Sequence, residues 1–299
     1  MMSSRPVLLA CILPALVPVA AVVAAAPVTP PAIAAAAPAR DWAAIDPEDL
    51  LLLDLADGGR VAIALAPAFA PLHAANIRLL ARAHWFDGVA IVRVQDGYVT
   101  QWGDPDGKRP LPPAIQRQVP PEYDRPATGL SITPLSYRDT YAPRVGFVAG
   151  FPVAGDGRRA WLTHCYGMVG VGRDNTPDTG TGAELYAVIG HAPRALDRNI
   201  ALVGRVVDGM DRLAALPRGS GDLGFYADPR QRTGIVRVRI AADVPPGERP
   251  AFEWLRPGGA SFAAWRRVKA NRHDAFYLRP AGAVDLCNAL PPVRRAGAG

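Results

Sequence analysis

The residues best suited to chemistry lie close together between residues 86 and 104, in the stretch FDGVAIVRVQDGYVTQWGD. Arg93 and Gln101 can donate hydrogen bonds, and Tyr98 places an aromatic ring between them in the sequence. Alternating apolar residues around Arg93 predict a strand. Burying a charged side chain costs free energy unless a partner or a substrate uses it. The stretch is therefore a candidate binding site. The alternative is an arginine at the rim of a barrel, with its guanidinium in water.

Other motifs that could carry chemistry are incomplete. Residues 170–172 lack the third glycine of a dinucleotide-binding loop, and residues 218–221 lack the first glycine of a nucleophile elbow. The histidines are spread along the chain without the spacing of metal ligands. We therefore expect neither a metal ion nor a cofactor.

The composition indicates a globular chain with many turns. Of 299 residues, 49% are hydrophobic and 20% are charged, and 29 glycines and 31 prolines favour short strands over long helices. The formal net charge of +6 would suit nucleic acid or an anionic membrane if it were concentrated. Apart from a cluster at 266–272, the basic residues are scattered. A solvated basic surface is the simpler interpretation, and we expect no nucleic-acid partner.

The N-terminus has the pattern of a signal peptide covering residues 1–26. Arg5 precedes an apolar run at 7–26, which ends in small residues suited to cleavage. An uncleaved anchor is the alternative, but Pro14 and Pro18 interrupt the run. Cys11 resembles a lipidation site, yet it follows Arg5 too closely for the usual apolar region, so we do not expect lipid anchoring. We expect a periplasmic or secreted protein without stable membrane insertion after cleavage.

Export would change how the cysteines are interpreted. Removal of the signal peptide leaves Cys165 and Cys287 in an oxidising compartment, where a disulfide between them is one expectation. The chain-entropy model gives such a long loop about 4–5 kcal/mol of stabilisation. Two separate buried thiols are the alternative.

Local patterns predict many short strands and a few helices. We expect a mobile Ala/Pro-rich linker at 27–47, a long surface loop at 105–144 and a C-terminal extension at 244–299. Such a chain is typical of a closed barrel or a sandwich. Hairpins are predicted at 50–66 and 145–165, further strands at 168–172, 183–190, 196–207 and 234–242, and helices at 71–83, 208–216 and 262–272, the last with Ser261 as N-cap.

Four segments in this order resemble the cyclophilin-type peptidyl-prolyl cis-trans isomerases: 70–88, 92–105, 167–190 and 196–211. The second contains VRVQDGYVTQWGDP, which is similar to the family's F-H-R-x-x-P-x-F-M-x-Q-G-G-D. The resemblance implies a mainly β fold, a closed eight-stranded antiparallel barrel capped by two helices. This cyclophilin-like domain would cover 48–243 with an insertion at 106–166, and the extension 244–299 would pack on it.

Individual residues follow from the same resemblance. Arg93 falls on the family's catalytic arginine and Gln101 on the motif glutamine, which implies that both are catalytic. The remaining positions would bind substrate, in part with altered side chains. Tyr98 and Val99 stand for Phe and Met, Glu184 for Gln, Leu185 and Tyr186 for two Phe residues, and Ile200 for His or Tyr, while Leu196 is unchanged.

The resemblance implies a peptidyl-prolyl isomerase. Together with the signal-peptide pattern, it predicts action on proline-containing unfolded or loop segments of exported proteins. We also expect a monomer. Rotating an amide costs about 18–20 kcal/mol because resonance is lost, and a guanidinium beside the twisting nitrogen would lower that barrier. The altered pocket leaves an alternative, a catalytically weak or inactive chaperone that only binds peptides. In a third interpretation, the basic helix of the extension docks onto anionic partners.

Overall fold

The computed structural model describes residues 28–104 and 106–297. The predicted signal peptide and Cys11 lie outside these residues. Within the described part of the chain, no helix is long and apolar enough to cross a membrane.

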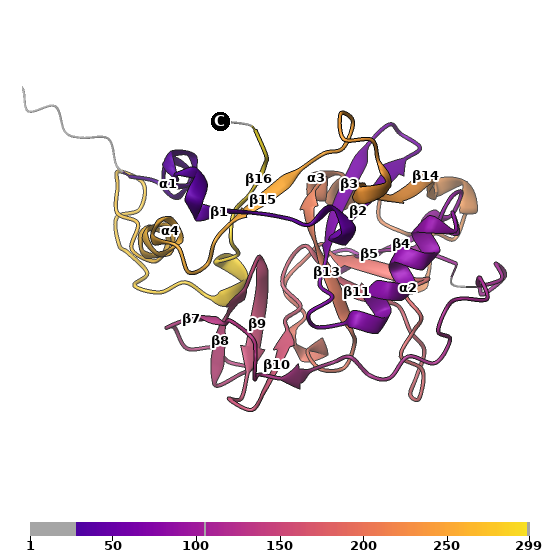
Figure 1. Ribbon diagram of the computed structural model, residues 1–299, viewed down its shortest axis with the longest axis horizontal. Coiled ribbons are helices and arrows are strands. Elements are labelled where there is room, and N and C mark those ends of the chain that lie inside the picture. Colours follow the sequence, from indigo (N-terminus) through magenta and orange to yellow (C-terminus); the bar gives the residue numbers. More distant parts are fainter. Residues whose placement is uncertain (1–27, 105, 298–299) are drawn as a thin grey trace, which may run out of the picture.

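An eight-stranded antiparallel barrel forms the larger half of the molecule (Figure 1), as predicted. Its strands follow one another around the barrel in the order β11-β12-β5-β4-β14-β2-β3-β13, and β13 pairs with β11 to close it. The bounds are β2 (Leu50–Leu55), β3 (Arg60–Leu65), β4 (Ala90–Val94), β5 (Val99–Gly103), β11 (Met168–Val171), β12 (Leu185–Val188), β13 (Leu202–Asp208) and β14 (Thr233–Ile240).

The first strand of the first hairpin, β2, is a nearly unbroken apolar run because both of its faces are buried. Leu51 and Leu53 point into the barrel, whereas Leu50 and Leu52 belong to a second core on the outside of the barrel. Successive side chains of a strand face opposite sides, so both faces of β2 are buried. The outer face of β2 is apolar because the inserted and terminal segments pack against it.

Two helices cap the barrel, as predicted. In α2 (Pro71–Arg82), Ile77 and Leu80 are fully buried in the barrel core. In α3 (Met210–Ala215), Leu213 is buried in the same core and its carbonyl accepts a hydrogen bond from Thr100 Oγ1 at 3.0 Å. The sequence placed both helices to within two or three residues because Pro71 suits a first helical turn and the apolar spacing is local.

The insertion departs from the prediction. The segment expected to be a long loop contains β6 (Arg125–Pro126) and β7 (Thr133–Leu135), and the expected hairpin is three strands, β8 (Arg144–Val148), β9 (Phe151–Gly155) and β10 (Arg159–Leu162). Together they form a five-stranded sheet in the order β6-β10-β9-β8-β7. The run 146–154 folds back on itself because Gly150 forms a second turn there, in addition to the predicted turn at 155–157.

The expected mobile linker is also structured. It contains α1 (Pro30–Ala36) and β1 (Trp42–Ala44), and β1 pairs with β15 (Phe252–Leu255) of the extension. β15 in turn pairs with β16 (Val293–Arg295). Trp42 is buried in the second core, so the segment gains apolar contacts with residues about two hundred positions away in the sequence, which no local pattern reveals.

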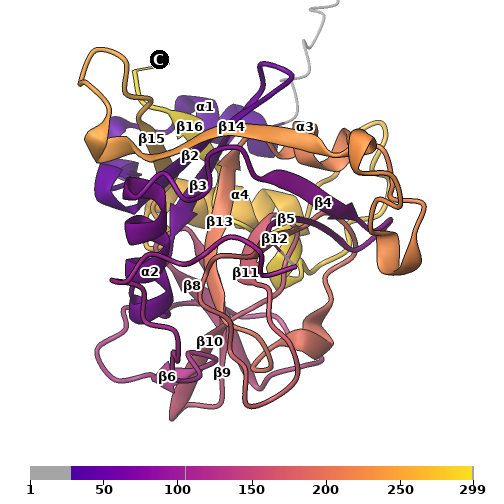
Figure 2. The same ribbon diagram turned by 90° about the vertical axis from the view of Figure 1, so that its right-hand side faces the viewer.

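The last helix, α4 (Ala260–Ala270), begins earlier than predicted. Its N-cap is Gly259, and Ser261 lies inside the first turn. The N–H of Ser261 donates instead to Asp41 Oδ2 at 3.0 Å. An acidic side chain from the N-terminal segment therefore accepts a hydrogen bond from the first turn of the helix. Figures 1 and 2 show how the terminal segments and the inserted sheet lie beside and behind the barrel.

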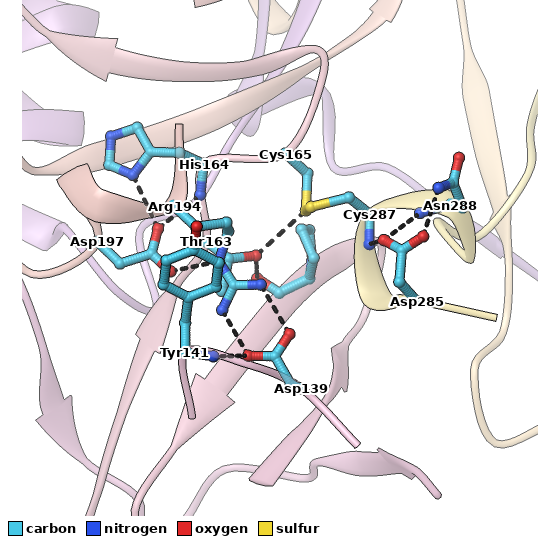
Figure 3. Close-up of polar contacts among 11 residues, drawn as sticks. Asp139, Tyr141, Thr163, His164, Cys165, Arg194, Asp197, Asp285, Cys287 and Asn288 are labelled. Carbon is cyan, nitrogen blue, oxygen red and sulfur yellow. Dashed lines mark hydrogen bonds and ion pairs between the residues drawn. A yellow bond between two sulfur atoms is a disulfide. The ribbon is translucent and has the colours of Figure 1, made fainter. Parts of the chain in front are cut away.

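A disulfide joins Cys165 to Cys287, with 5.0 Å between their Cα atoms, which confirms the predicted pair (Figure 3). Cys287 lies in η7 (Leu286–Asn288), so the bond ties the extension to the segment between β10 and β11. The remaining short 3-10 helices are η1 (Ala39–Asp41), η2 (Pro47–Asp49), η3 (Arg194–Leu196), η4 (Asp222–Gly224), η5 (Pro229–Gln231) and η6 (Ala241–Asp243).

Candidate functional site

The β4–β5 hairpin brings the two predicted catalytic residues together. In its register Arg93 stands opposite Gln101, and Arg93 Nη1 donates to Gln101 Oε1 at 2.9 Å. The register shifts between Ile91 and Arg93. Such an irregularity re-aims a side chain. Ile91 stays in the barrel core, whereas Arg93 is half-buried at the surface.

The Arg93 guanidinium is held from several sides. Its Nε donates to the carbonyl of Leu223 in η4 at 2.7 Å, and its Nη2 donates to Gln95 Oε1. Its Cζ lies 5.7 Å from the ring centre of Tyr98 and 5.4 Å from that of Phe225. A guanidinium has five N–H donors, and the three contacts with protein oxygens use three of them. Two donors remain for a bound molecule.

Gln101 connects Arg93 to Glu184. Its Nε2 donates to Glu184 Oε1 while its Oε1 accepts from Arg93, so the orientation of the carboxamide is fixed from both ends. Among the ion pairs of the described residues, none joins Glu184 directly to Arg93. Burial raises the pKa of Glu184, although the bond from Gln101 acts in the opposite direction. Burial lowers the pKa of Arg93, which Tyr98 and Glu184 partly offset.

A small apolar cluster forms next to this pair. Val99, Tyr186 and Val188 are buried together, and Tyr98 and Ile200 pack against them. Tyr186 and Val188 point to the same side of β12. Tyr186 is paired with Gln101 of the neighbouring strand, β5. The cluster therefore combines an aromatic floor, Tyr186, with aliphatic neighbours, and its partly exposed members Tyr98 and Ile200 present apolar surface to solvent.

The floor of this cluster is anchored by a buried polar network. The hydroxyl of Tyr186 lies 2.9 Å from His164 Nε2, and His164 Nδ1 lies 3.0 Å from Asp197 Oδ1. Asp197 also accepts from Arg194, which pairs with Asp139 at 2.9 Å (Figure 3). Burial raises the pKa of Tyr186, so its hydroxyl stays protonated and available for hydrogen bonding.

A cleft of about 710 Å³ opens beside Arg93. Gln101, Glu184, Leu223 and Phe225 are among the residues that line it. An extended peptide could therefore reach the free donors of Arg93 from solvent.

Comparison with known proteins identifies the family. The model of the family described as "Cyclophilin type peptidyl-prolyl cis-trans isomerase/CLD" matches residues 51–240. This chain belongs to that family. Probable peptidyl-prolyl cis-trans isomerases of Brucella suis and Brucella abortus are each 28% identical over 203 residues, which covers 67% of this chain and 86% of theirs. The crystal structure of a cyclophilin from Hirschia baltica has a TM-score of 0.68 and 23% identity, and the match covers 90% of this chain and 97% of the other, which shows the same fold.

Two of the positions carried over from the cyclophilin motifs lie away from the apolar cluster. Leu185 is fully buried inside the barrel, because neighbouring residues of a strand face opposite sides and Tyr186 faces outward. Leu196 is partly exposed in η3 and is not among the residues packed in the cluster. The structure brings together Arg93, Gln101, Glu184, Tyr98, Val99, Tyr186 and Ile200.

Sequence reasoning missed three contributors to this cyclophilin site. Val188 could have been found from the alternation of β12, since it lies two residues after Tyr186. His164 and Asp197 could have been suspected because a buried tyrosine in place of phenylalanine needs a hydrogen-bond partner. Which side chains supply it depends on the insertion.

Proposed function

We propose that this cyclophilin-type isomerase accelerates the rotation of X-Pro bonds in exported proteins, with Arg93 and Gln101 as its catalytic residues. The observation that carries the proposal is the position of a half-buried guanidinium, hydrogen-bonded to Gln101 at 2.9 Å, beside a small apolar cluster to which Tyr98 and Ile200 contribute partly exposed side chains. No cofactor is required for this reaction.

The chemistry follows from the loss of amide resonance. When the X-Pro bond twists, the prolyl nitrogen becomes pyramidal and regains a lone pair. A remaining N–H donor of Arg93 would bond to this nitrogen more strongly in the twisted state than in the planar ground state. Only such differential binding accelerates a reaction. Tyr98, Val99, Tyr186 and Ile200 would hold the ring, and Gln101 would hold the peptide backbone.

Two features support export as part of the proposal. The apolar run at 7–26 with its small terminal residues suits a signal peptide. The disulfide between Cys165 and Cys287 is of a kind that persists in oxidising compartments. The substrates we propose are proline-containing unfolded or loop segments in the periplasm or outside the cell.

Arg93→Ala tests the catalytic role. Removing one preorganised donor typically costs a factor of about 100 or more, so we expect kcat/KM in a protease-coupled proline-peptide assay to fall about 100-fold. Arg230→Ala is the matched control, because Arg230 is an exposed arginine that pairs only with Asp228. It should keep wild-type activity. Equal rates for wild type and Arg93→Ala would disprove the role assigned to Arg93.

One observation favours the alternative, a binding module without turnover. Three protein oxygens, from Leu223, Gln95 and Gln101, already engage the Arg93 guanidinium. If a substrate cannot reach the remaining donors, the apolar cluster would bind proline segments without isomerising them. This alternative predicts that wild type suppresses the aggregation of an unfolded client, that Arg93→Ala does so equally well, and that neither accelerates isomerisation above buffer.

A further inference from the structure

The loop after α4, residues 271–279, is shaped by one acidic side chain. Asp274 Oδ1 accepts the backbone N–H groups of Phe276 and Tyr277, both at 2.9 Å, and Asp274 Oδ2 accepts from Arg272 Nε at 2.7 Å. The Asp274 N–H donates to the Tyr277 carbonyl at 3.2 Å. Arg272 also lies over the Tyr277 ring at 4.3 Å. The loop therefore has a defined shape of its own.

This shape presents two large apolar side chains to solvent. Phe276 is 81% exposed and Leu278 is 71% exposed, more than any other large hydrophobic residue of the described chain. Single exposed apolar residues are common, but two at the tip of an ordered loop mark a contact surface. Because both project from a tip, they suit insertion into a soft surface better than the filling of a groove.

Basic residues predominate in the sequence on both sides of the tip. Between residues 260 and 282 there are five basic residues and one acidic residue, Asp274, which pairs with Arg272. Lys269 and Arg279 are exposed, form no ion pair with the rest of the described chain and line the same groove as Tyr277. An apolar tip within a positive surface is the combination that binds anionic lipid headgroups.

The loop also lies at the end of the molecule that carries the first described helix, α1. α1 packs against α4, and Pro30 and Pro31 line one groove of about 580 Å³ together with Tyr277 and Arg279. In Figure 1 this end, with α1 and α4, lies opposite the end that carries β4 and its Arg93. A surface bound here would leave the isomerase site facing away from it.

We infer that residues 271–279 and the side of α4 that carries Lys269 dock onto an anionic lipid surface. Phe276 and Leu278 would enter the headgroup region, while Lys269 and Arg279 would lie near lipid phosphates. The inference is independent of the catalytic roles proposed above. It would hold the enzyme beside a membrane, where newly exported chains emerge.

Vesicle co-sedimentation tests the inference. The chain from Val28 onward keeps every helix and strand of the described residues and lacks the apolar run that would itself bind lipid. We expect it to bind vesicles of phosphatidylglycerol and phosphatidylcholine about tenfold more tightly than vesicles of phosphatidylcholine alone, and more weakly at high salt. Phe276→Ser/Leu278→Ser and Lys269→Glu/Arg279→Glu should each lower the affinity for the anionic vesicles about tenfold.

The control is Val236→Ser, which removes another exposed apolar side chain, on β14. It should bind anionic vesicles like wild type, and all variants should retain wild-type isomerase activity on a soluble peptide, which shows that they are folded. Equal binding to neutral and anionic vesicles would overturn the inference. Unchanged binding after Phe276→Ser/Leu278→Ser would also overturn it. So would an absence of binding to either kind of vesicle.

Discussion

The carboxylate of Glu184 is the most unusual feature of the site at the scale of single residues. By resemblance a glutamine is usual at this position, and the structure uses the carboxylate as an acceptor for Gln101. A glutamine could accept the same hydrogen bond through its side-chain carbonyl, without a charge to bury. The carboxylate therefore carries an electrostatic cost that the hydrogen bond does not require.

Glu184→Gln is expected to stabilise the protein at neutral pH. Burial raises the pKa of Glu184, so the folded protein holds this proton more tightly than the unfolded chain does. Stability is then lost as the pH rises from the ordinary range of glutamate through the folded-state pKa. The variant should unfold at a higher temperature than wild type at about pH 7, and the difference should shrink at about pH 4.

The same measurement on Glu248→Gln, an exposed carboxylate, provides the control and should show little change at either pH. A gain for Glu184→Gln that is equally large at both pH values would mean that its charge is not the cause.

At the scale of secondary-structure elements, the turn between β8 and β9 joins the insertion to the extension. A Cβ at Gly150 would overlap the indole ring of Trp254 in β15, so only glycine lets the turn approach this closely. The Gly150 carbonyl accepts from Arg205 Nη1 at 2.8 Å, and the same nitrogen reaches the Pro291 carbonyl at 3.0 Å. Burial lowers the pKa of Arg205 to about 10. This arginine of β13 thus holds both added segments against the barrel.

Gly150→Ala should therefore destabilise the protein. Overpacking of a close contact typically costs about 1–3 kcal/mol, because Trp254 and the turn must separate. Urea unfolding would measure the loss. Gly247→Ala is the matched control, since nothing lies within 4 Å of a Cβ at that position. Similar stabilities for the two variants would show that the turn and β15 are not tightly packed.

At the scale of the whole molecule, the described residues form two large cores that share the wall of the barrel. One fills the barrel, and the other lies between the barrel, the inserted sheet and the terminal segments. Cys165 belongs to the second core, and Cys287 packs against it. The disulfide therefore closes a loop of 122 residues across this core, and it lies one residue from His164, which anchors Tyr186.

Replacing both cysteines, as Cys165→Ser/Cys287→Ser, should lower the free energy of unfolding by about 4–5 kcal/mol in the chain-entropy model, because the unfolded chain regains the freedom of the long loop. Urea unfolding of wild type without reductant and of the variant would give the difference. Peptide mapping of protein from its native compartment should find the two cysteines linked. Free thiols that react with an alkylating agent there, or equal stabilities, would contradict this prediction.

Much of the barrel and the centre of the site follow from the sequence alone. Hairpins and helices are local, so the alternation in β2 and β3 and the spacing in α2 predicted their places, and the turn at 95–98 sets Arg93 beside Gln101. The apolar alternation of β12 also contained the information that Leu185 faces inward and Tyr186 outward, although the family motif suggested that both line the pocket.

Only the tertiary structure decided the rest. Several contacts join residues that are far apart in the chain. They are the pairing of β1 with β15, the hydrogen bond from the Ser261 N–H of α4 to Asp41, and the contacts of His164 with Tyr186 and Asp197. Such contacts depend on how complete elements pack, and a local pattern does not encode which distant surface will cover an apolar residue or satisfy a buried hydroxyl. The sequence thus determined the barrel and its paired Arg93 and Gln101, while packing decided the floor and the outer support of the site.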